Sequence, residues 1–119
     1  MIRSLPSALL RLEAAALVAL SVGIYVQLAA PWLLFAALFL VPDFALLGYR
    51  FGARAGATAY NLFHTSIGPV VLLATGFLSD QPMVMAVAAI WLTHIGLDRL
   101  LGYGLKYPTF SKDTHLARV

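Results

Sequence analysis

Four long apolar segments restrict the folds that this chain can adopt. They cover about residues 8–29, 32–49, 55–78 and 83–104, and each approaches or exceeds the roughly 20 residues with which an α-helix crosses a bilayer. A bilayer offers no water to the backbone, so a single spanning segment must satisfy its own hydrogen bonds as a helix. The sequence therefore predicts an all-α protein with four transmembrane helices.

Short breaks separate these four segments. They contain Pro31, the Gly52-Ala53-Arg54 stretch and residues 79–82, and proline, glycine and polar clusters are typical of turns. Helices joined by such short connections lie next to each other and antiparallel. We therefore expect residues 1–119 to form a single integral membrane domain, a four-helix bundle with up-down-up-down topology.

The positions of Lys and Arg predict the orientation of the bundle. These residues form three groups: Arg3 with Arg11, Arg50 with Arg54, and Arg99 with Lys106, Lys112 and Arg118. The first and third turns contain none, so the positive-inside rule places both termini and a tail at 107–119 in the cytoplasm. A cleaved signal peptide is the alternative interpretation of residues 1–29. The length of that run and Glu13 within it argue against this alternative.

Composition excludes several classes of protein. Hydrophobic residues make up 61% of the chain and charged residues 11%, compared with about 25% charged in ordinary soluble domains. The net charge is +3, but the basic residues lie at helix ends rather than on one exposed face, so we expect no nucleic-acid partner. The chain has no cysteine, which excludes disulfides, thiolate metal ligands and cysteine nucleophiles.

Ionisable side chains interrupt the apolar segments at a similar predicted depth. They are Glu13, Asp43, His64, His94 and Asp98. A charge at the centre of a membrane helix costs about 2.5 to 3.5 kcal/mol on insertion scales, so these groups must pair, be hydrated or bind a ligand. Helical spacing places Asn61 on one face with His64, and His94 on one face with Asp98. We predict that Asp43, His64, His94 and Asp98 meet in one interior site in the cytoplasmic half.

A divalent transition metal is the first candidate ligand of this site. Two imidazoles with carboxylates suit zinc, iron or manganese. Glu13 and Asn61 are additional candidate ligands, and Asp113 and His115 in the tail are further ones. Soluble di-metal bundles use a comparable set of side chains, but Asn61 stands where a carboxylate would be needed, so one metal fits better than two. Such a metal would support hydrolysis of a lipid-like substrate, or oxygen chemistry.

Other functions remain open on the sequence alone. One is a proton-coupled transporter or a binding protein for a small molecule, and another is a purely structural polar network. Interhelical hydrogen bonds contribute only about 0.6 kcal/mol on average, which is less than embedded charges cost. Haem between His64 and His94 is a minor alternative. Small multidrug resistance transporters also have about four short helices and a glutamate in the first, but they have no counterpart of these histidines and aspartates.

Two further patterns concern the backbone of the middle helices. Pro42 removes a backbone donor directly before Asp43 and predicts a kink in the second helix. Gly48, Gly52 and Gly56 recur every four residues around the second turn. Small residues at this spacing are typical of closely packed membrane helices, so we expect the second and third helices to approach each other there.

Several longer motifs resemble a family of small bacterial integral membrane proteins whose function is uncharacterised. The motifs are Pro42-Asp43 with Gly48-Tyr49, Tyr60-Asn61-x-x-His64, the run from His94 to Tyr107, and Phe110-x-x-Asp113-Thr114-His115-Leu116. The resemblance covers nearly the whole chain and implies a four-helix protein, placed by its bacterial members in the inner (plasma) membrane. It implies no activity. The lipid bilayer is the expected partner, with a lipid-like or small-molecule ligand and a homo-oligomeric state as further expectations.

Overall fold

A computed structural model describes residues 4–103 and residue 105, and this part of the chain is entirely helical. Its elements are α1 (Leu5–Leu28), α2 (Trp32–Leu38), the 3₁₀ helix η1 (Val41–Phe51), α3 (Ala53–His64), α4 (Ile67–Leu78) and α5 (Pro82–Leu101). Four segments are long and apolar enough to cross a membrane: Leu5–Leu28, Trp32–Phe51, Ala53–Leu78 and Pro82–Leu101. The all-α class and the four membrane-length segments are therefore confirmed. The predicted tail at 107–119 lies outside the described residues.

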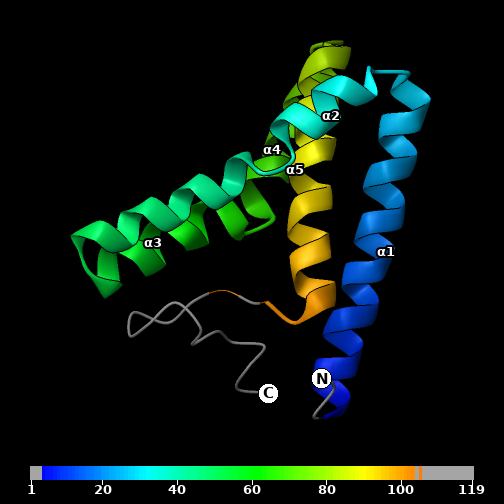
Figure 1. The fold of residues 1–119 in the computed structure, drawn as a ribbon. Helices are drawn as coiled ribbons and strands as arrows, with labels where there is room; N and C mark the ends of the chain where they lie inside the picture. Colours follow the sequence, from blue (N-terminus) through cyan, green and yellow to red (C-terminus); the bar gives the residue numbers. More distant parts are fainter. Residues whose placement is uncertain (1–3, 104, 106–119) are drawn as a thin grey trace.

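Helices α1 and α5 lie side by side along much of their length and form the main axis of the molecule (Figure 1). The two backbones approach closely at Gly96, where a Cβ atom would lie 2.8 Å from Cγ2 of Val18. The hydroxyl of Thr93 donates a hydrogen bond to that of Ser21 at 2.9 Å, and both side chains are buried. Small residues and paired hydroxyls thus hold α5 against α1, as is typical of membrane helices.

Each of the two middle membrane-length segments is divided. Helix α2 ends at Leu38 and η1 begins at Val41, so the chain bends where Pro42 predicted a kink. Helix α3 ends at His64 and α4 begins at Ile67, within the range 55–78 that was predicted as one helix. Pro69 has no N–H to donate to the carbonyl of Thr65, which explains why a continuous helix is not formed there.

Helices η1 and α3 form a hairpin that leaves the α1–α5 axis at a wide angle (Figure 1). They pack closely on each other and contact the other helices only sparsely. The predicted close approach is present, because a Cβ atom at Gly56 would lie 2.2 Å from the Tyr49 ring and one at Gly48 would lie 2.9 Å from Cβ of Ala59. Since the hairpin diverges, the up-down-up-down bundle stays a prediction.

The amino end of α1 and the carboxyl end of α5 lie at the same end of the molecule (Figure 1). Arg11 lies near the amino end of α1 and Arg99 near the carboxyl end of α5, whereas Arg50 and Arg54 lie at the tip of the hairpin. From the first two, with the sequence pattern, we expect both termini in the cytoplasm. Fusions of a fluorescent protein and of a periplasmic phosphatase to each terminus would measure this, and only the fluorescent fusions should be active. Opposite reports from the two termini would mean an odd number of spans and would contradict the expected topology.

Candidate metal centre

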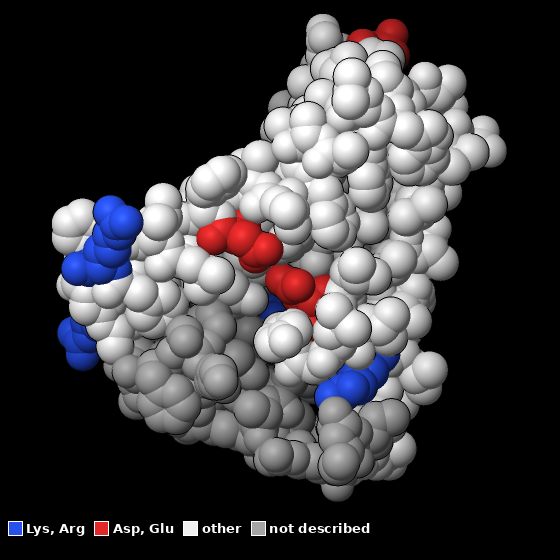
Figure 2. Space-filling model, viewed as in Figure 1, with Lys and Arg blue, Asp and Glu red and all other residues white. Residues whose placement is uncertain are grey.

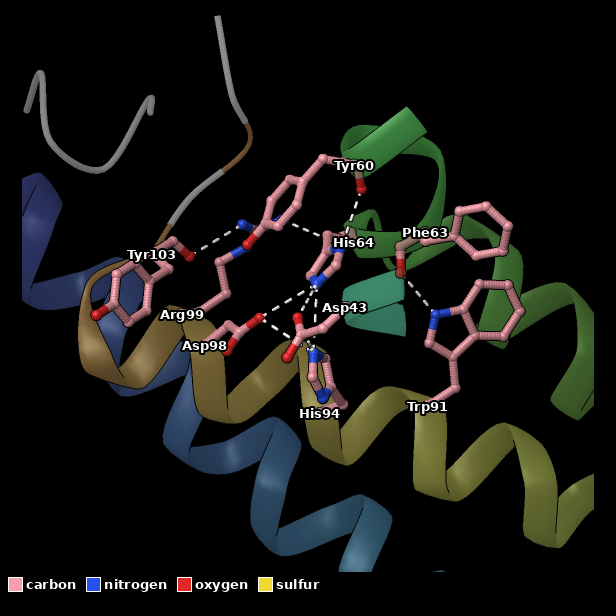
Figure 3. A network of polar contacts seen from close by, with 9 residues as sticks. All are labelled: Asp43, Tyr60, Phe63, His64, Trp91, His94, Asp98, Arg99 and Tyr103. Atoms are coloured by element: carbon pink, nitrogen blue, oxygen red, sulfur yellow. Dashed lines mark hydrogen bonds and ion pairs between the residues drawn. The ribbon is translucent and has the colours of Figure 1, made fainter. Parts of the chain in front are cut away.

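Four of the predicted side chains converge where the hairpin meets α5 (Figure 3). Asp43 lies in the first turn of η1, His64 is the last residue of α3, and His94 and Asp98 are one turn apart on α5. One nitrogen or oxygen atom from each residue lies within 4.8 Å of the other three. Asp43 and His64 are 21 residues apart in the sequence, and His94 follows His64 by 30 residues. The two helix breaks therefore bring distant parts of the chain together against α5.

Five of the six separations between the four ligand atoms are short, and the sixth is within 4.8 Å. Nε2 of His64 lies 3.2 Å from Oδ1 of Asp43 and 3.4 Å from Oδ2 of Asp98. Nε2 of His94 lies 3.1 and 3.3 Å from the same two oxygens, and the two Nε2 atoms are 3.3 Å apart. Tetrahedral ligands at the usual zinc–nitrogen distance are about 3.3–3.4 Å from one another. The cluster therefore has dimensions that suit one transition-metal ion.

The hydrogen bond on the far side of the His64 ring decides what this residue presents to the cluster. Nδ1 of His64 lies 2.9 Å from the backbone carbonyl of Tyr60, and a carbonyl can only accept, so Nδ1 carries the proton. In the neutral ring Nε2 then has a lone pair directed at the oxygens of Asp43 and Asp98. Metal-binding histidines usually donate their other N–H to a carbonyl or carboxylate in this way.

Aromatic rings hold the two imidazoles in place. The Tyr60 ring stacks on the His64 ring with centroids 3.7 Å apart and planes 6° apart. On the other side, the Phe39 ring lies edge-on to His94 at 5.2 Å. Both histidines are buried, whereas the side chain of Asp43 is 42% exposed and that of Asp98 is 21% exposed. The cluster is thus closed around its nitrogens and open beside its carboxylates.

The open side can be located on the surface of the molecule. Figure 2 shows acidic side chains at the junction between the hairpin and the main axis, with basic atoms directly beside them and uncharged atoms above them. Acidic groups in such surroundings are costly unless a cation balances them. The side of the cluster that carries Asp43 is therefore the side from which an ion, water or a substrate can reach it.

Arg99 is a part of the site that the sequence did not single out. Its Nη2 donates to the His64 carbonyl at 2.8 Å and its Nη1 donates to the Tyr103 carbonyl at 3.2 Å. The carbonyl of His64 belongs to the last residue of α3, so the break in the helix leaves it needing such a donor. The position of Arg99 directly after Asp98 on the same helix could have indicated this role, but the sequence pattern also explains Arg99 by the positive-inside rule.

The remaining candidate ligands have different positions. Glu13 is exposed on α1 and, among the described residues, is not a member of the four-residue group. It lines a separate cavity of about 160 Å³ together with Ser66 and Arg99. Asn61 is partly buried one turn before His64 on α3. Asp113 and His115 lie outside the described residues.

Comparisons with known proteins identify a family but no function. A family model described as a domain of unknown function, DUF4260, matches residues 7–119. No curated protein and no solved structure matches the chain. The function must therefore be inferred from the site itself.

Proposed function

The chain belongs to the DUF4260 family, and we propose that it is an integral membrane protein that binds one divalent transition metal and uses it for hydrolysis. The ligands are Asp43, His64, His94 and Asp98, and zinc is the ion that suits them best. The observation that carries this proposal is the convergence of two imidazole nitrogens on two carboxylate oxygens, with nitrogen–oxygen separations of 3.1 to 3.4 Å.

Electrostatics requires a cation at the centre of this cluster. The His64 lone pair faces two carboxylate oxygens, and this arrangement is repulsive unless a proton or a metal lies between them. A proton on Nε2 accounts for a bond to one oxygen at a time. A metal ion is attracted to all four atoms at once, which explains why all four are close together.

Charge balance also favours a divalent ion. Two ionised aspartates and one divalent cation sum to zero, so the complete centre adds no net charge to its apolar surroundings. Without a cation between them, the two partly exposed carboxylates would instead repel each other across the cluster. The donor set of two nitrogens and two oxygens suits zinc, iron or manganese, and the chain has no thiolate that would favour copper(I).

The exposed carboxylate side gives the site a route for water and substrate. Catalytic zinc keeps a coordination position for water; the exposed Asp43 would yield that position here, and the bound water would then be acidic enough to supply hydroxide near neutral pH. For an acyl ester, the oxygen of that water would bond to the acyl carbon while the bond to the alcohol oxygen breaks. The alcohol would take up the proton, so the reaction requires no oxidant or reductant.

We expect protein purified without chelator to contain about one transition metal per chain. Elemental analysis measures this number, and replacement of the metal by cobalt(II) should give the visible absorption of a low-symmetry site with nitrogen and oxygen ligands. Removing the metal with a chelator and adding zinc should restore the stoichiometry. If neither the purified protein nor protein incubated with zinc, iron or manganese retains a metal, the proposal is wrong.

Proton-coupled transport is a second candidate, and the two helix breaks favour it. Transporters commonly place their coupling sites where membrane helices are interrupted, and here the breaks lie beside Asp43 and His64. In that case the cluster would carry a proton instead of a metal. Metal-free protein that transports a solute with protons, and loses this activity on Asp43→Asn, would support transport over hydrolysis.

A further inference from the structure

An apolar cavity of about 180 Å³ lies directly beside the four-residue cluster. Its walls include Pro42 of η1, Phe63 of α3, and Val87, Ile90 and Trp91 of α5. The polar N–H of Trp91 is directed at the Phe63 carbonyl, to which it donates a hydrogen bond at 2.7 Å (Figure 3). The cavity is thus lined by hydrocarbon, and the indole that lines it has its own acceptor.

The cavity and the cluster are neighbours: none of the four cluster residues lines the cavity, but three of its wall residues stand close to them in the chain. Pro42 directly precedes Asp43 and Phe63 directly precedes His64. On α5, Trp91 comes one turn before His94, so both side chains lie on the same face of the helix. A ligand whose chain fills the cavity and extends past Pro42 and Phe63 would therefore bring its end to the carboxylates and imidazoles.

The chemistry of the cavity selects a hydrocarbon. Enclosed apolar cavities of about 150 Å³ stay dry and bind benzene, and this one has a comparable volume and apolar walls but opens to the protein surface. Apolar residues of its wall are partly exposed, with Val41 at 45% and Phe63 at 47%. In segments that are apolar enough to cross a membrane, such exposed residues face lipid chains. An acyl chain can thus enter from the bilayer without crossing water.

From this adjacency we propose that the protein binds a single-chain amphiphile, with its hydrocarbon chain in the cavity and its carboxyl or ester group at the cluster. The inference rests on the proposed function, because a carboxyl oxygen is a natural ligand of a divalent metal. It names the substrate class as a fatty acyl ester, whose hydrolysis leaves a fatty acid with its carboxylate at the metal. The volume of the apolar cavity then limits the length of the acyl chain that the site accepts.

Fatty acids of increasing length test the cavity in cobalt(II)-loaded protein held in phospholipid nanodiscs. Acetate, butyrate, hexanoate and octanoate should change the visible cobalt spectrum, with affinity rising roughly fourfold for each added methylene. Val87→Phe fills the cavity, so it should abolish this rise and leave the acetate affinity unchanged. Val71→Phe, at a position 59% exposed on α4, is the matched control and should keep the wild-type rise.

The comparison between variants also separates the cavity from the membrane. Partitioning into the nanodisc strengthens the binding of longer acids equally in all variants, so only the difference between Val87→Phe and Val71→Phe reports the cavity. Equal slopes in the two variants and the wild type would overturn the inference while leaving the metal centre intact. Absence of any cobalt spectrum would count against the metal centre instead.

Tryptophan fluorescence tests the cavity without relying on a metal. Trp91 lines the cavity, and Trp32 is the only other tryptophan of the chain. In Trp32→Phe protein, 8-bromooctanoate should quench Trp91 at a concentration at which it leaves Trp32 of the Trp91→Phe protein largely unquenched. Adding Val87→Phe should remove this preferential quenching. Equal quenching of both tryptophans, or quenching that Val87→Phe does not change, would refute the bound chain.

Discussion

Replacing His94 by alanine should lower the affinity of the protein for zinc by roughly 10²–10³-fold. Structural zinc sites with four ligands bind with about 10–16 kcal/mol in total, so one ligand accounts for about 2.5–4 kcal/mol. The membrane helices should remain folded, because their backbone hydrogen bonds and packing do not depend on one ligand. Competition with a chromophoric chelator measures the affinity, and circular dichroism measures the helix content.

Two matched controls make this result specific to the cluster. His115→Ala removes the third histidine of the chain and Asp80→Asn removes an exposed aspartate beyond α4, so both should bind zinc like the wild type. Asp43→Asn makes the same chemical change as Asp80→Asn but inside the cluster, and should weaken binding strongly. A His115→Ala protein that loses as much affinity as His94→Ala would show that the tail contributes a ligand and that the four-residue centre is incomplete.

The all-α class and the four membrane-length segments could be predicted because they depend on local properties. Length and apolar content are sufficient to identify a segment that crosses a bilayer, and the kink at Pro42 follows from a single missing N–H. The break after His64 has the same cause, because Pro69 also lacks an N–H, so this break was predictable from the sequence as well. The direction in which the hairpin then leaves the main axis depends on packing between distant segments, which residue spacing does not contain.

The site was predictable in part for the same reason. Spacing along α5 places His94 and Asp98 on one face, and depth from the helix ends places Asp43 and His64 at a similar level. Depth is only one coordinate, however, and the rotation of each helix about its axis is set by its neighbours. Glu13 lies at a depth similar to the cluster but belongs to an exposed part of α1. Its separation from the four-residue group could therefore not be read from the sequence.

Gly56→Ala should destabilise the protein, whereas Gly23→Ala should stabilise it. A Cβ at Gly56 would lie 2.2 Å from the Tyr49 ring, so α3 and η1 must move apart. Overpacking of this kind costs about 1–3 kcal/mol. Nothing lies within 4 Å of a Cβ at Gly23 in α1. There alanine should stabilise the helix by about 0.5–1 kcal/mol, the usual advantage over glycine.

The Gly56→Ala substitution should also weaken the metal centre, although it changes none of the ligands. Asp43 is carried by η1 and His64 by α3, so separating the hairpin separates two ligands of one ion. Zinc affinity should fall about 5- to 150-fold, the equivalent of 1–3 kcal/mol, whereas Gly23→Ala should bind zinc like the wild type. Unfolding by sodium dodecyl sulfate and zinc competition measure the two effects. Gly56→Ala protein with lower stability but unchanged zinc affinity would show that hairpin packing does not position the ligands.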